Sequence, residues 1–143
     1  MREAMFDVQD PGRNLLNTDC TIYQEISKIA HVMRTTEAMR FGRMYFRQIS
    51  GDGVHFGFPF GHEYTLAFSR ILLPQEVLVA YNVSDKHRAD HVVVSSEYHA
   101  AGDRLHVLYG GPVGHADVEV QRNPDGTHQV QLDLAPRQFV ILG

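Results

Sequence analysis

The stretch from Glu76 to Asp85 constrains the fold of this chain more than any other segment. Its centre contains neither Gly nor Pro, and three of its residues are β-branched valines. Alternate positions from Val77 to Val83 place three valines and a tyrosine on one face, and Leu78 and Ala80 occupy much of the other. A strand that is apolar on both faces must be covered on both sides. The segment therefore predicts a central strand of a packed β core.

Length and composition limit the classes of protein that this chain can belong to. At 143 residues it suits one domain, with room for a fragment of another. The net charge of -4, with no block of like charges, argues against a nucleic-acid groove or a membrane-surface patch. Cys20 is the only cysteine, which excludes an intrachain disulfide and a cysteine-based zinc cluster. We therefore expect no nucleic-acid partner, no membrane partner and no cofactor.

The N-terminus and the histidines point to no targeting signal and no metal site. Residues 1–8 lack the apolar region of a signal peptide, and no stretch approaches the ~20 apolar residues of a membrane span. A cytoplasmic location is the expectation. The nine histidines are scattered, and the nearest pair, His87 and His91, spans a predicted loop and strand. A zinc site needs three or four converging ligands, so surface or hydrogen-bonded histidines are expected instead.

Two periodicities divide the chain near Gly42. Before it, one apolar stripe recurs at helical spacing, formed by Ile22, Ile26, Ile29, Ala30 and Met33. This stripe predicts one long helix that ends near Arg40, with Gly42 as its C-terminal cap. After Gly42 the period becomes 2. The strands predicted there are Met44–Ile49, Val54–Phe58, Tyr64–Leu73, the central strand, His91–Tyr98, Arg104–Tyr109, 116–121, 129–134 and Gln138–Leu142.

The strand pattern predicts the fold class. Asn123-Pro-Asp-Gly126 is the strongest hairpin turn, and turns recur every 8 to 12 residues. Such a run is typical of an antiparallel sandwich or barrel. We therefore predict a mainly β protein, an antiparallel Greek-key β-sandwich of about eight strands preceded by one long α-helix. A lone helix ahead of such a run resembles the end of a preceding domain.

Several segments together resemble the C-terminal part of α-amylase-family glycoside hydrolases. They are the helix Ile22–Arg34, then Thr36–Arg43, then Ala67–Arg70 and Glu76–Ser84. In that family the last helix of the (β/α)8 barrel leads into Pro-Ala-Leu-Arg-x-Gly, and a β-sandwich called domain C follows. Here the corresponding residues are Glu37-Ala-Met-Arg-Phe-Gly42, which lack the usual proline. The resemblance covers nearly the whole chain, and its motifs are structural rather than catalytic.

The resemblance implies a domain organisation. Residues 1–42 would be a loop and the final helix of a truncated (β/α)8 catalytic domain, and residues 43–143 would be domain C. The parent would cleave or transfer α-glucosidic bonds through a covalent intermediate, which requires two carboxylates roughly 5 Å apart. The family places its Asp, Glu and Asp residues on barrel strands that would lie upstream of Met1. The chain by itself is then expected to be non-catalytic.

Two groups of residues are candidates for contact with substrate or with the missing barrel. Arg2, Glu3 and Asp7 would line the rim of the substrate site if residues 1–16 form a βα loop, although loop packing and solvation is the plainer interpretation. Phe56, Phe58, Phe60 and Tyr64 concentrate rings in a Gly-rich loop. These rings would either stack on sugar or dock on the barrel, and docking is favoured because large rings make strong interface anchors.

Three functions remain open from the sequence. The first is an accessory domain of an α-amylase-family glycosidase or glucan transferase, whose partners would be the missing barrel and an α-glucan. The alternatives are an independent carbohydrate-binding β-sandwich module and a protein-interaction module. On the first hypothesis the apolar stripe from Ile22 to Met33 has lost its partner, so self-association through this helix face is expected.

Overall fold

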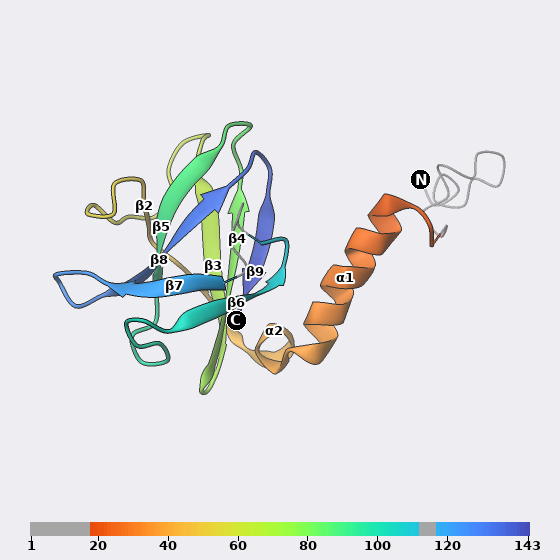
Figure 1. Cartoon of the computed structure of the whole chain (residues 1–143), viewed down its shortest axis with the longest axis horizontal. Coiled ribbons are helices and arrows are strands. Elements are labelled where there is room, and N and C mark those ends of the chain that lie inside the picture. The colour runs from red at the N-terminus through yellow and green to blue at the C-terminus, as the bar shows by residue number, and fades with distance from the viewer. Residues whose placement is uncertain (1–17, 112–116) are drawn as a thin grey trace. The chain divides into compact units, whose positions relative to one another are not determined.

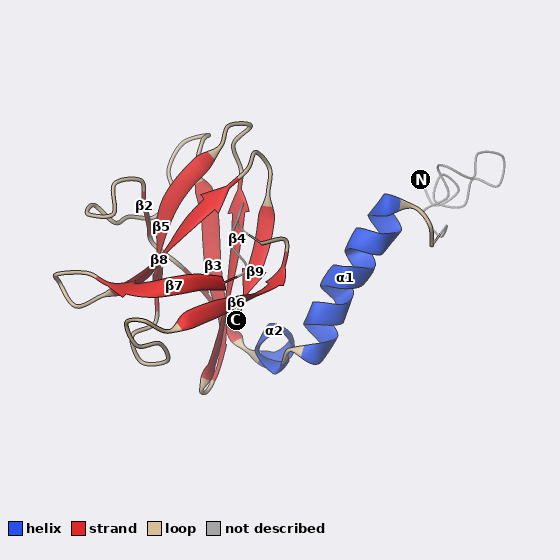
Figure 2. Ribbon diagram, in the orientation of Figure 1, coloured by secondary structure: helices blue, strands red, loops and turns tan. Residues whose placement is uncertain are grey.

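A computed structural model describes residues 18–111 and 117–143, and their secondary structure is shown in Figures 1 and 2. These residues belong to two compact units, which divide between Thr36 and Glu37. The first contains α1 (Thr21–Thr35). The second contains α2 (Glu37–Phe41) and nine strands: β1 (Arg43–Phe46), β2 (Ile49–Ser50), β3 (Thr65–Leu72), β4 (Gln75–Asn82), β5 (Arg88–Val94), β6 (Arg104–Tyr109), β7 (Asp117–Arg122), β8 (His128–Leu134) and β9 (Phe139–Leu142). The predictions for Arg2, Glu3 and Asp7 lie outside the described residues.

The nine strands form one curled antiparallel sheet, in the order β1-β3-β4-β9-β6-β7-β8-β5-β2 (Figure 2). Strands β5 to β8 take the order β5-β8-β7-β6, which is a Greek key. The two end strands, β1 and β2, follow each other in the chain. Arg47 N–H donates to Ala67 on one side, and Gln48 accepts from Val93 N–H on the other. The mainly antiparallel β prediction is therefore confirmed, and residues 47 and 48 join the two ends of the sheet.

The inner face of the curled sheet holds the hydrophobic core. Alternate residues of β4 and β9, such as Leu78 and Leu142, meet residues from β5, β7 and β8 there. The cluster comprises Ala67, Leu78, Ala80, Val92, Val94, Leu105, Val118, Val120, Val130, Leu132, Leu134, Val140 and Leu142. Burying each of the larger of these side chains contributes roughly 1.5–3 kcal/mol, which is offset by the entropy cost of ordering the chain.

Strand β4 is central, as its sequence predicts. It pairs with β3 on one side and β9 on the other. Val77 and Val79 point away from the core but are no more than 1% exposed, so both faces of β4 are covered. Helix α2 packs on β3 and β4 and supplies part of this cover. Its fully buried Ala38 receives a hydrogen bond from the backbone of Gly42 at 2.9 Å.

The prediction of one long helix is wrong. Helix α1 ends at Thr35, because Thr36 adopts an extended backbone (φ -111°, ψ 109°) while its N–H still bonds Val32 O at 3.0 Å. A separate five-residue helix, α2, follows. Thr35 and Thr36 are β-branched residues, which lose side-chain freedom in a helix and so favour a break at this point. Neither helix in the described part of the chain is long and apolar enough to cross a membrane.

Three strand predictions also need correction, and one turn is confirmed. The strand predicted at His91–Tyr98 is β5, which runs from Arg88 to Val94. Met44–Ile49 is two strands rather than one, because Arg47 and Gln48 carry the chain from β1 to β2. Val54–Phe58 is not a strand, and only the bridge between Ile49 and Gly57 forms there. The hairpin at 123–126 is confirmed: Asn123 N–H bonds Thr127 O at 2.8 Å, and Gly126 has the positive φ of 89° that this turn requires.

Candidate functional site

The predicted aromatic site lies in the loop between β2 and β3. Phe60 is 96% exposed and Phe58 is 64% exposed, so both rings face solvent. Phe56 and Tyr64 are half-buried. The structure thus divides the four predicted residues into two that are available to a partner and two that support the loop.

A dense hydrogen-bonded turn fixes the start of this loop. Asp52 accepts hydrogen bonds from the Ser50 hydroxyl at 2.7 Å and from the backbone N–H groups of Val54 and His55, both at 2.9 Å. His55 Nδ1 lies 2.7 Å from the same carboxylate. The hydrogen bond from the His55 side chain, followed by those of the backbone and of Ser50, holds the pKa of Asp52 well below its usual range. The serine bonds the aspartate rather than the histidine, so the three residues form a turn and not a nucleophilic triad.

An exposed apolar surface lies at the β1 end of the sheet. We call it the β1 surface, and it comprises Phe41, Met44 and Phe46, which are 50% to 64% exposed. Strand β1 is the first in the sheet order, so its outer backbone edge is available for pairing. Met44 and Phe46 lie on the same sheet face as Val77 and Val79, through the register with β3. They extend the apolar outer face of β4 to the edge of the sheet.

A buried carboxylate organises one end of the core. Glu76 has a fully buried side chain, and its Oε1 accepts hydrogen bonds from Ser69 Oγ and Arg47 Nη2, each at 2.5 Å. Its Oε2 accepts from Ser95 N–H at 2.9 Å and lies 3.3 Å from His99 Nε2. The partners come from β3, from the β1–β2 connection and from the segment after β5. Glu76 therefore ties three separate parts of the chain together.

These contacts determine the ionisation of Glu76. Burial raises the pKa of a carboxyl group, but hydrogen bonds from His99 and Ser69, the charge of Arg47 and the Ser95 N–H outweigh it. The net result lowers the pKa of Glu76 to about 2. A carboxylate held this firmly and sealed from solvent has a structural role, because it is not accessible to a substrate.

Sequence reasoning did not single out Glu76, although a signal was present. Position 76 falls on the same face of β4 as Leu78 and Ala80, so alternation alone places its carboxylate in the core. A buried carboxylate needs charged or polar partners. Arg47 is the cation that pairs with Glu76, but the sequence predicts it only as part of the continuous strand Met44–Ile49.

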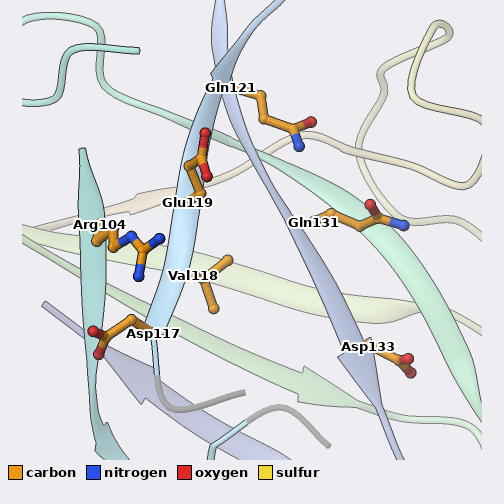
Figure 3. Close-up of a pocket in the computed structure, with 7 residues that line it drawn as sticks. All are labelled: Arg104, Asp117, Val118, Glu119, Gln121, Gln131 and Asp133. Atoms are coloured by element: carbon orange, nitrogen blue, oxygen red, sulfur yellow. The ribbon is translucent and has the colours of Figure 1, made fainter. Parts of the chain in front are cut away.

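A cleft opens between β7 and β8 (Figure 3). Its volume is about 410 Å³. Six polar side chains and one valine line it: Arg104, Asp117, Val118, Glu119, Gln121, Gln131 and Asp133. The sequence singles out none of these residues as a site. Alternation marks Val118 as core and the five polar residues on β7 and β8 only as the solvent side of their strands.

Comparison with solved structures finds similar folds, while no protein-family model and no curated protein sequence matches the chain. A debranching enzyme from Nostoc punctiforme aligns with a TM-score of 0.58 and 21% identity, over 91% of this chain and 22% of that chain. Its native form aligns with a TM-score of 0.57 and 23% identity, over 85% and 21%. The fold is shared.

A second enzyme has a similar fold over most of this chain. An Anoxybacillus alpha-amylase aligns with a TM-score of 0.53 and 16% identity, over 90% of this chain and 24% of that chain. The chain thus spans less than a quarter of the length of each of these enzymes. At these identities the similarity establishes the fold, and activity must be argued separately.

Proposed function

We propose that this chain is the C-terminal part of a longer glycosidase or glucan transferase that acts on α-glucosidic bonds. Residues 43–143 would be its accessory β domain, and residues 1–42 would belong to the end of a (β/α)8 catalytic barrel. The observation that carries this proposal is the alignment of 91% of the chain with only 22% of a debranching enzyme. The alignment with an α-amylase over a similar share supports it.

A non-catalytic role for the domain is proposed on chemical grounds. Retaining glycoside hydrolysis uses one carboxylate as nucleophile and a second as acid and base, on either side of the bond. The fully buried carboxylate of Glu76 is held ionised by His99, Ser69 and Arg47. Asp52 is committed to its turn in the same way. Glu76 and Asp52 therefore have structural roles.

The β1 surface supports the presence of a partner domain. Exposed apolar patches on a soluble domain mark interaction sites, and an exposed edge strand invites pairing. Phe41, Met44 and Phe46 present such a patch beside α2, where the chain enters the β domain. We propose that the barrel of the parent enzyme covers this surface and that the domain stabilises the barrel in return.

The size of the native polypeptide tests this proposal. An antibody raised against residues 37–143 is used to probe an extract of the source cells after denaturing electrophoresis. The proposal predicts a reactive band several times heavier than 16.2 kDa. The purified 143-residue chain should release no reducing sugar from maltotetraose. A reactive band at 16.2 kDa alone, or hydrolysis by the purified chain, contradicts the proposal.

The aromatic loop favours a second function, an independent carbohydrate-binding module. Phe58 and Phe60 expose rings that can stack on the faces of sugars. Calorimetric titration with maltotetraose tests it, with Phe58→Ala and Phe60→Ala as variants. Phe41→Ala is the matched control, because Phe41 and Phe58 are both 64% exposed. Binding lost only in the loop variants supports the module, whereas binding that both loop variants retain assigns the loop to docking on the barrel.

A further inference from the structure

The cleft between β7 and β8 exists because these two strands separate. Their ladder covers three pairs, from Val120 opposite Val130 to Arg122 opposite His128. Beyond Val120 each strand keeps its other neighbour, since 117–119 pair with β6 and 131–134 pair with β5. Figure 3 shows the two strands close at Gln121 and apart at Asp117 and Asp133. The pairing of β7 with β6 and of β8 with β5 therefore holds the two strands apart.

The separation turns main-chain groups toward the cleft. Val120 N–H donates to Asp103 O at 2.8 Å, and Val120 O accepts from Gly102 N–H at 2.9 Å, so the main chain of Val120 points toward β6. Because this direction alternates along a strand, the main-chain N–H and C=O of Glu119 point toward β8. The same alternation points the main chain of Gln131 toward β7. Main-chain groups of Glu119 and Gln131 thus lie at the narrow end of the cleft, next to the last pair of the ladder.

The side chains of the cleft add planar polar groups of both kinds. Gln121 and Gln131 each carry two donor hydrogens and one acceptor oxygen. Asp117, Glu119 and Asp133 contribute acceptors, and Arg104 contributes donors. The core residue Val118, only 7% exposed, is the one apolar residue in the lining. A ligand that fits must therefore both donate and accept many hydrogen bonds.

Histidine and arginine side chains lie beside the carboxylates of the lining. His106 Nδ1 lies 3.0 Å from Asp117 Oδ1, and His87 Nε2 is paired with Asp133. Arg104 is directly opposite Glu119 in the β6–β7 register. Asp117 and Asp133 thus each have a histidine partner, which leaves their carboxylates less available to a free cation. An anionic ligand would meet three carboxylates at close range, which Coulomb repulsion opposes.

Other ligand classes fit poorly. In the described ranges, 18–111 and 117–143, no group of three or more His, Cys, Asp or Glu residues is placed to hold a metal ion. An apolar ligand would displace water from the polar lining without replacing its hydrogen bonds, and such desolvation has an unfavourable free energy. A volume of about 410 Å³ lies within the range of about 300–1,000 Å³ that is typical of small-molecule sites.

We propose that the β7–β8 cleft binds a neutral saccharide. Its hydroxyl groups both donate and accept hydrogen bonds and match the amide and carboxylate side chains of the cleft. This inference goes beyond the proposed function, because it assigns a site that neither the catalytic barrel nor the aromatic loop supplies. It holds whether or not the native polypeptide is longer than this chain.

Titration of the full chain with maltotetraose and with cellotetraose tests the cleft. Amide resonances of residues 117–121 and 131–133 should shift in a saturable way with at least one of the two sugars. Glu119→Ala and Gln131→Ala, both exposed positions, should each weaken binding about tenfold through lost hydrogen bonds. Glu63→Ala is the matched control, because Glu63 is an exposed glutamate outside the cleft.

The outcomes separate this proposal from the others. Retained affinity in Glu63→Ala and Phe58→Ala, with loss in Glu119→Ala and Gln131→Ala, supports the cleft. Shifts confined to the loop at 56–64, or no saturable shift with either sugar, overturn it. Saturable binding of calcium chloride at the cleft without binding of either sugar also overturns it. None of these results changes the size of the native polypeptide, on which the proposed function rests.

Discussion

Arg47 is ion-paired with the fully buried carboxylate of Glu76, with Nη2 at 2.5 Å from Oε1. Arg47 lies where the chain crosses from β1 to β2, and Glu76 lies on the central strand β4. The pair therefore connects the two ends of the curled sheet to an interior strand. Ser69 bonds both partners, since its hydroxyl receives a hydrogen bond from Arg47 Nε at 2.7 Å and donates one to Glu76.

Removal of the Glu76 carboxylate should destabilise the β domain strongly. Glu76→Ala leaves the Arg47 guanidinium, only 15% exposed, without its partner, and such a loss costs about 3–5 kcal/mol. Glu63→Ala is the matched control, because its pair with Lys86 at 2.8 Å is exposed and worth at most about 1 kcal/mol. Urea unfolding followed by fluorescence measures both. Equal losses in the two variants would contradict the role given to Glu76.

Acid should weaken the domain through Glu76. Its pKa is about 2 in the folded protein against an ordinary value of 4.5, so its contribution is complete above pH 4.5 and lost as the pH falls toward 2. The contribution is about 3 kcal/mol, since one pKa unit corresponds to about 1.4 kcal/mol. Urea unfolding over this pH range measures it.

Glu76→Gln provides the reference for the acid measurement. Asp52 and Asp125 also have a lowered pKa and are retained in both proteins, so their effects cancel in the difference. The difference in unfolding free energy between the wild type and Glu76→Gln should shrink between pH 4.5 and 2. A difference that is independent of pH in this range would show that Glu76 does not ionise as described.

Gly42 should be irreplaceable by alanine. A Cβ atom at Gly42 would lie 2.4 Å from Ala38 O and 2.9 Å from the Ile71 carbonyl, both backbone atoms that cannot rotate away. Gly42→Ala should therefore cost about 1–3 kcal/mol, as other overpacked sites do. Gly57→Ala is the control, because its Cβ would meet no atom within 4 Å. Thermal unfolding of the two variants should separate them clearly, and a neutral Gly42→Ala would disprove the close approach of α2 to β3.

The helix α1 should mediate self-association of the isolated chain. Ile22, Ile26 and Met33 are 45% to 60% exposed, and they form the apolar stripe predicted from the sequence. Sedimentation at high micromolar concentration should detect dimers or larger species, and Ile26→Glu should reduce them. Ser27→Glu, an exposed neighbour off the stripe, should not. A monomer with an intact helix under these conditions would contradict this prediction.

The sequence was most informative where one periodicity acts alone. Period 2 located β4 and the β7–β8 hairpin because their inner residues are uniformly apolar. It failed at Arg47 and Gln48, where an unbroken pattern conceals a change of sheet partner that only long-range pairing determines. It also failed at Thr36, where one extended residue divides two helical segments.

The candidate sites were less predictable than the fold. Ring content marked Phe58 and Phe60, and the structure exposes both. The β7–β8 cleft could not be foreseen, because it depends on where a ladder stops and not on which residues alternate. The Glu76 cluster brings together residues up to 52 positions apart along the chain, from Arg47 to His99, and no local pattern encodes that meeting.

Our central proposal is that this domain belongs to an enzyme that acts on α-glucans. The most direct measurement is a starch-gel zymogram of native cell extract, with the same lane probed by an antibody against residues 37–143. We predict that the antibody-reactive band coincides with a zone of starch clearing and has a mass several times larger than 16.2 kDa. A reactive band that clears no starch, at any size, would contradict it.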